Sequence, residues 1–225
     1  MTGDVDPPAV RAAAERVFES WPDAQPANSP QPSPSPKPKP DKDMIVFNAG
    51  GPSVRAGFLL RAPKGADPGF ATMSMLNAIL GGGSGADTRL YREVRTRRGL
   101  VYAIGSAYNA NEGELYVGFE STKRNFAAAR TAVRDVVDEL RTGTISTEER
   151  DRAYRKLLVR ALRRQAVPDE VLDDLGSLAQ SHRAPGDAGS LAALYAAISP
   201  GDLERFARTA LRLDHATEFE EGFGH

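Results

Sequence analysis

The stretch that decides the fold is residues 76–108, which read LNAILGGGSGADTRLYREVRTRRGLVYAIGSAY. An apolar segment over 69–80 has helical character and runs directly into Gly81–Gly83. Glycines at this place end a helix, because glycine adopts the backbone conformations that close the last turn. A second helix is expected over 87–98, stopped by Gly99. The stretch therefore predicts two helices separated by a glycine loop.

Outward from this stretch, strands are expected on both sides. Alternating apolar runs over 100–108 and 114–121 predict a hairpin. The other expected elements are strands over 44–48 and 54–61, and helices over 8–21, 124–141, from 146 onward, 169–180, 189–197 and 201–211. Strands and helices do not alternate in this order. The sequence therefore predicts an α+β fold, with a largely antiparallel sheet and helices packed on one face.

Composition divides the chain into four segments. These are a helical N-terminal piece over 1–21, a Pro-rich linker over 22–43, a globular domain over 44–213 and a polar tail over 214–225. Eight prolines interspersed with Ser and Lys favour an extended spacer in the linker over a ligand for a proline-binding module. The acidic run after Leu213 does not resemble an apolar strand, so no intact final strand is expected there.

Bulk properties exclude several classes of protein. The formal net charge is -1 and the pI about 6.3, which gives no electrostatic sign of nucleic-acid binding. The basic stretch over 150–164 is flanked by acids, which favours a solvated, salt-bridged helix face. No apolar run approaches the roughly 18 residues needed to span a bilayer. The N-terminus lacks the features of a signal peptide, so a cytoplasmic location is expected if Met1 is the native start. Otherwise the compartment is unknown.

Metal and nucleophile signatures are missing from the sequence. There is no cysteine, and the three histidines are His182, His215 and His225. A zinc site without cysteine needs about three converging His or carboxylate ligands. Solvated surface histidines are the favoured interpretation, and no metal site is expected. The glycine loop lacks the lysine of a phosphate-binding loop, and Ser84 follows a helix rather than the strand that a nucleophile elbow requires.

The central stretch resembles the second half of zinc peptidases of the pitrilysin/insulinase type (inverzincins). The matching pieces are Leu80–Gly83, Thr88–Tyr91, Glu93–Arg95 and Arg98–Tyr102. The start of the chain, about 1–22, is similar to the last strand and helix of the first half of these proteins. The resemblance covers about 1–22 and 44–211.

What the resemblance implies is a non-catalytic half. Such peptidases are two α+β halves that clamp a peptide, and only the other half carries an inverted His-x-x-Glu-His zinc site. The substrate-binding residues implied for this half are Arg95 and Tyr102, seven positions apart. The glycines Gly81, Gly82 and Gly83 would form a flexible hinge near the cleft. No catalytic residue, no bound metal and no activity are expected from this chain alone. Zinc is expected on a partner half, which would form a heterodimer with this chain around a peptide substrate.

Two alternatives remain open on the residues themselves. Arg95 near a helix end could simply complement the helix dipole, and Tyr102 could be an ordinary core side chain. At the level of function, the chain could be a catalytically dead scaffold subunit or a truncated relic of such a peptidase. The sequence decides neither the peptide specificity nor the identity of the partner.

Overall fold

The computed structural model describes residues 4, 6–21, 44–47, 53–83, 85–165, 167, 169–173, 176 and 187–222. The predicted linker over 22–43 lies outside the described residues. Of the helix predicted over 169–180, residues 169–173 and 176 are described, and they are helical.

The described strands form one five-stranded sheet. Its strands are β1 (Met44–Phe47), β2 (Ser53–Arg61), β3 (Ala103–Asn109), β4 (Glu114–Thr122) and β5 (Thr217–Glu221). Their order across the sheet is β1-β5-β2-β4-β3. Neighbouring strands are antiparallel except β1 and β5, which are parallel.

The two long central strands alternate between a covered and an open face. One face of β2 and β4 carries the buried residues Ala56, Phe58, Leu60, Leu115, Val117 and Phe119. The residues between them include Arg55 and Tyr116, which are exposed on the opposite face. This two-residue period is the reason why these segments form half-buried strands.

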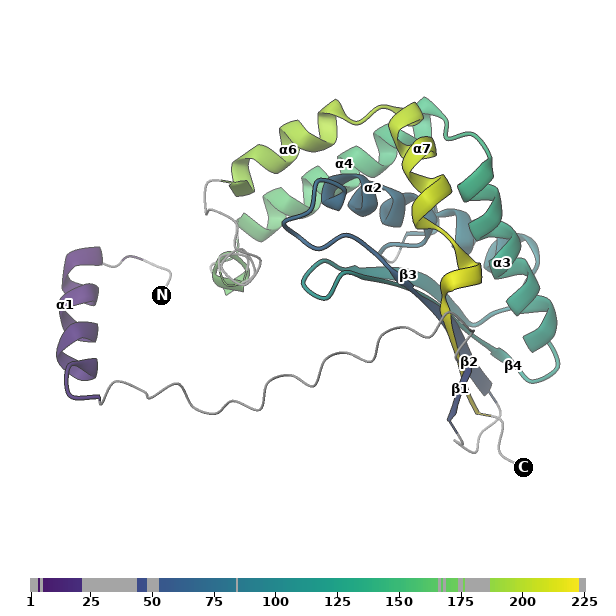
Figure 1. The fold of residues 1–225 in the computed structure, drawn as a ribbon, viewed down its shortest axis with the longest axis horizontal. Helices are drawn as coiled ribbons and strands as arrows, with labels where there is room; N and C mark the ends of the chain where they lie inside the picture. The colour runs from purple at the N-terminus through teal and green to yellow at the C-terminus, as the bar shows by residue number, and fades with distance from the viewer. Residues whose placement is uncertain are drawn as a thin grey trace.

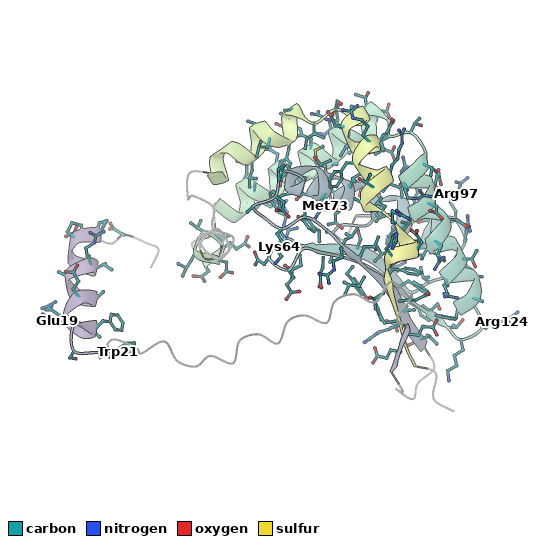
Figure 2. The ribbon with its side chains drawn as sticks, in the orientation of Figure 1. Glu19, Trp21, Lys64, Met73, Arg97 and Arg124 are labelled. Carbon is teal, nitrogen blue, oxygen red and sulfur yellow. The ribbon has the colours of Figure 1, made fainter. Side chains whose placement is uncertain are left out.

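Helices cover one face of the sheet, as Figure 1 shows. The helical elements are α1 (Pro7–Phe18), α2 (Phe70–Leu80), the π-helix η1 (Tyr91–Arg97), α3 (Phe126–Thr142), α4 (Thr147–Gln165), α6 (Asp187–Ala197), α7 (Pro200–Ala210) and the 3-10 turn η2 (Leu213–His215). The helix α2 lies deepest, and its Met73 is fully buried between the sheet and the other helices (Figure 2). The predicted α+β class with helices on one face is confirmed.

The prediction of a polar tail over 214–225, with no intact final strand, is wrong, because β5 forms within this segment. This strand pairs with both β1 and β2 and so lies inside the sheet. Its Glu218 is only 6% exposed, and its carboxylate accepts hydrogen bonds from Nε and Nη2 of Arg130 on α3. Nη1 of Arg134 lies 3.7 Å from the same carboxylate. Arginines therefore neutralise the buried acid of this acidic segment, which can then pair as a strand, and the globular unit extends beyond Leu213.

The helix α1 contributes nothing to this core. None of its residues is buried, and Val17, Phe18 and Trp21 are all more than half exposed. The rings of Phe18 and Trp21 contact each other edge to face at 4.8 Å. Large apolar side chains at the end of α1 and just beyond it are therefore exposed to solvent.

Among the described residues, no helix is both long enough and apolar enough to cross a bilayer.

Candidate functional site

A glycine turn lies at the centre of the candidate site. The π-helix η1 ends at Arg97, and Gly99 follows with φ +62°, a left-handed conformation that other residues adopt only at a cost. The Gly99 N–H donates to the carbonyl of Arg95 at 3.1 Å, and the Leu100 N–H donates to the carbonyl of Val94 at 3.2 Å. These bonds close the helix end and direct the chain into β3.

Arg95 precedes this turn by four residues and is exposed. Its guanidinium lies 4.9 Å from the centroid of the Tyr91 ring, one helical turn earlier. A cation over an aromatic face is held in place without being neutralised. Among the residues that the structure describes, no carboxylate lies within ion-pair distance of Arg95. Its charge is therefore available to a ligand.

Tyr102 follows the turn and is 59% exposed. It lies just before β3, which begins at Ala103 rather than at the predicted residue 100. The Tyr102 N–H donates to the carbonyl of Glu120 on β4 at 2.7 Å, which fixes the backbone at this point. Its hydroxyl makes no hydrogen bond to any described residue. The alternative that Tyr102 is an ordinary core side chain is therefore wrong.

The predicted hinge glycines are tightly held at two of their three positions. Gly81 and Gly82 are buried, and a Cβ on Gly81 would lie 2.7 Å from the Ser106 nitrogen. The Ser106 N–H donates to the Gly81 carbonyl at 3.1 Å, and the Ser106 hydroxyl donates to Oδ1 of Asn77 at 2.6 Å. Gly83 is exposed, with φ +76°. Close backbone approach therefore explains Gly81 and Gly82, and a hinge role for the loop stays a prediction.

Lys156 of α4 is a residue near this loop that sequence analysis misses. Its Nζ is buried, has no hydrogen-bond partner among the described residues, and lies 3.7 Å from Oδ1 of Asp87. A Cβ on Gly85 would meet this nitrogen at 2.8 Å. The ammonium therefore lies against the glycine loop. No local pattern distinguishes Lys156 from the other basic residues of α4, so only the packing of α4 on α2 could have indicated it.

Metal-ligand geometry is missing from the described part of the chain. No group of three or more His, Asp or Glu residues lies close enough there to hold a metal ion. His215 is an exposed residue whose Nε2 lies 3.5 Å from Oδ2 of Asp214. The other two histidines, His182 and His225, lie outside the described residues.

The basic stretch of α4 has a structural use at its start. Arg150 donates to the carbonyls of Ile198 and Ala196 at the end of α6, and its Nη1 donates to Asp151 at 2.8 Å. A cation at a helix C-terminus satisfies carbonyls that have no partner within the helix. Arg150 is thus a helix cap that joins α4 to α6.

Together, these features define an α+β domain that presents hydrogen-bond donors at a glycine turn and has no cluster of metal ligands among its described residues. The chain belongs to the family of peptidase M16 inactive domains, whose model matches residues 1–157. The resemblance to the non-zinc half of pitrilysin-type peptidases is thereby confirmed. No curated protein matches the sequence.

Solved structures agree in fold. The peptidase M16 inactive domain from Pseudomonas fluorescens is 21% identical, with a TM-score of 0.73 over 81% of this chain and 44% of that chain. A protease from Helicobacter pylori is 16% identical, with a TM-score of 0.80 over 97% of this chain and 53% of that one. The inactive peptidase domain of a Bordetella parapertussis protein described as a zinc protease is 19% identical. Its TM-score is 0.65 over 76% of this chain and 93% of that chain. This chain thus spans about half the length of the first two.

Proposed function

We propose that this chain is the substrate-binding half of a zinc-dependent endopeptidase, acting with a second half or subunit that carries the His-x-x-Glu-His site. Membership in a family of inactive peptidase domains supports the non-catalytic role. The observation that supports the substrate-binding role is the exposure of Arg95 and Tyr102 on either side of the Gly99 turn, where neither side chain donates a hydrogen bond to a described residue.

The chemistry of these two groups fits a supporting part in peptide hydrolysis. At neutral pH a guanidinium and a phenol are hydrogen-bond donors. Donors directed at a peptide carbonyl orient it and stabilise the oxyanion that develops when water attacks. Neither group can generate the attacking hydroxide, which requires a metal-bound water or a general base. The pair therefore contributes to catalysis only when zinc is supplied from the other half.

The exposed helix α1 is the proposed attachment to that other half. The side chains Val17 and Phe18 at its end, and Trp21 just beyond it, are 63%, 51% and 69% exposed, which is unusual for neighbouring large apolar residues. A short amphipathic helix is marginal in water unless its apolar face packs on another surface. We propose that this face packs on the zinc-bearing half and joins the two halves of a heterodimer.

A reconstitution experiment tests the proposal. The zinc-bearing half is sought in the coding sequence upstream of Met1 and in the adjacent reading frame, and both proteins are purified. We expect no peptide hydrolysis by this chain with added zinc, and hydrolysis when the halves are combined. Stoichiometric zinc uptake by this chain alone, with hydrolysis, would contradict the proposal.

A scaffold role is the second candidate. One structural neighbour is a chain of complex III2 from Candida albicans, 12% identical with a TM-score of 0.69 over 80% of this chain. The fold therefore occurs in a chain of a large assembly. Under this alternative, substitutions at Arg95 and Tyr102 leave peptide turnover unchanged, and substitutions at Phe18 and Trp21 disrupt assembly.

A further inference from the structure

The strand β3 lies at one edge of the sheet, so half of its backbone groups point away from β4. Within an antiparallel strand, residues two apart direct their N–H and C=O groups the same way. The Ser106 N–H points outward, because it donates to the Gly81 carbonyl rather than to β4. It follows that the N–H and C=O of Ile104 also point outward, whereas those of Gly105 face Gly118 on β4.

One end of this edge is closed by the glycine loop. Gly82 forms a parallel bridge with Ser106, so the loop occupies the edge at that position. The loop can approach β3 so closely because Gly81 carries no side chain: a Cβ there would lie 2.7 Å from the Ser106 nitrogen. A strand adding to β3 must therefore stop short of Ser106.

The other end is shaped by a β-bulge. Ala103 stands opposite Glu120 in the register, and the Tyr102 N–H also donates to the Glu120 carbonyl at 2.7 Å. Ala103 of β3 and the residue before it, Tyr102, therefore both oppose Glu120 of β4, which is the geometry of a β-bulge and bends the chain where the exposed Tyr102 side chain begins.

Between these ends lies Ile104, whose outward N–H and C=O take part in no backbone hydrogen bond with the residues that the structure describes. Its neighbour Ala103 is exposed, and Ile104 itself is half-buried. Unpaired donors and acceptors at a sheet edge form a template for another extended backbone.

We propose that an extended peptide pairs with β3 at Ile104, between the glycine loop and Tyr102. The proposal rests on the substrate-binding function proposed above and names the backbone contact of that site. Pairing through main-chain groups is independent of side-chain identity, so the edge accepts peptides of varied sequence. Arg95 and Tyr102 then contact the same peptide beyond the bulge.

A peptide is favoured over a second copy of this chain as the occupant. Edge-to-edge pairing of two copies needs a run of free backbone groups on both strands. Here the glycine loop occupies the edge at Ser106, and two copies would bring two such loops together. The short open segment around Ile104 instead suits the few hydrogen bonds that a flexible peptide makes.

Amide hydrogen exchange of the full chain, resolved by residue with NMR, tests this inference. The probe is a peptide of alternating Val and Thr flanked by Glu, a composition that favours extended backbone. We expect saturating peptide to slow exchange at Ile104 by about tenfold or more, and to leave the already paired Gly105 unchanged. The fully N-methylated peptide, which cannot pair as a strand, is the matched control and should have no effect.

Each outcome separates the two proposals. Peptide binding without protection at Ile104 overturns the edge-pairing inference and leaves the substrate-binding function in place. Failure of this peptide to bind overturns the edge-pairing inference, whereas the substrate-binding function is decided separately by peptide hydrolysis with the assembled halves. Protection at Ile104 that depends on protein concentration rather than on peptide shows a second copy as the occupant and also overturns the inference. Protection that persists in the Arg95→Gln and Tyr102→Phe variants supports main-chain pairing as an independent contact.

Discussion

Arg89 and Glu149, sixty positions apart, form a bidentate ion pair in which Nε and Nη2 each donate a 2.9 Å hydrogen bond to the carboxylate. Nη2 of Arg89 also donates to the Thr144 carbonyl at 2.8 Å. The side chains are only 9% and 14% exposed. This pair joins the segment that follows the glycine loop to the start of α4, where Glu149 also accepts the Ser146 N–H at 3.2 Å as part of a helix cap.

Removing the charge of Glu149 is expected to destabilise the fold. Glu149→Gln leaves the buried Arg89 without a counter-charge, which costs about 3 kcal/mol in the free energy of unfolding. Urea unfolding followed by circular dichroism measures the change. Glu148→Gln removes the same charge from an exposed neighbouring position and should change stability by less than about 0.5 kcal/mol. Equal effects of the two substitutions would show that the pair has no stabilising role.

The same pair predicts a dependence on pH. Burial acts to raise the pKa of Glu149, but the hydrogen bonds and charge of Arg89 outweigh it and lower the pKa overall. A lowered pKa in the folded state gives stabilisation that is present above the unfolded value, about 4.3, and is lost as pH falls through the folded value. The stability gap between wild type and Glu149→Gln should therefore shrink below pH ~4. A gap that stays constant down to pH ~2 would contradict this assignment.

Gly57 is expected to resist enlargement. A Cβ there would lie 2.4 Å from the Val117 carbonyl oxygen and 2.6 Å from the Phe219 ring of β5. Gly57→Ala should therefore destabilise the fold by about 1–3 kcal/mol, because the strands or the ring must shift. Gly176→Ala is the control, since none of the described residues lies within 4 Å of a Cβ there, and it should be neutral or stabilising. Thermal unfolding of both variants checks the difference.

Truncation tests the place of β5 in the sheet. A chain ending at Ala216 lacks the strand that lies between β1 and β2, and exposes the edge of β2. We expect loss of cooperative unfolding and aggregation in gel filtration, because an uncovered edge of a central strand pairs with other chains. A truncated chain that stays monomeric and unfolds cooperatively would show that β5 is dispensable.

Local patterns predict the helices well. The predicted segments over 69–80, 124–141 and 201–211 correspond to α2, α3 and α7 with ends that differ by at most two residues. Their apolar faces repeat at helical spacing, and their ends carry glycine, proline or a capping residue. These signals depend only on residues a few positions apart, so the sequence contains them directly.

Long-range pairing explains what the sequence does not predict. The strand β5 looks polar in the sequence because it contains glutamates, and the residue that pairs with its buried Glu218, Arg130, lies 88 positions away. The start of β3 depends on the bulge opposite Glu120, on a different strand. The close packing of Gly81 against Ser106 likewise requires two segments to meet in space. No local periodicity reports any of these contacts.

The site was predictable only in part. Similarity to a family motif points to Arg95 and Tyr102, and the structure shows that both are exposed. Among the described residues, Arg95 has no carboxylate within ion-pair distance and the Tyr102 hydroxyl has no hydrogen-bond partner. Ile104 and Lys156 could not be predicted, because their environment is created by the edge of the sheet and by the packing of α4.

The most direct test of the central claim is the kcat/KM for peptide hydrolysis by the assembled halves. We predict that Arg95→Ala and Tyr102→Phe each lower it about a hundredfold, because each removes a donor to the developing oxyanion. Arg97→Ala is the matched control, since Arg97 lies two positions away at the exposed surface (Figure 2) and pairs with Glu93 on its own helix. Its kcat/KM should stay unchanged. Wild-type turnover in both the Arg95 and Tyr102 variants would contradict the account and leave the scaffold role as the better explanation.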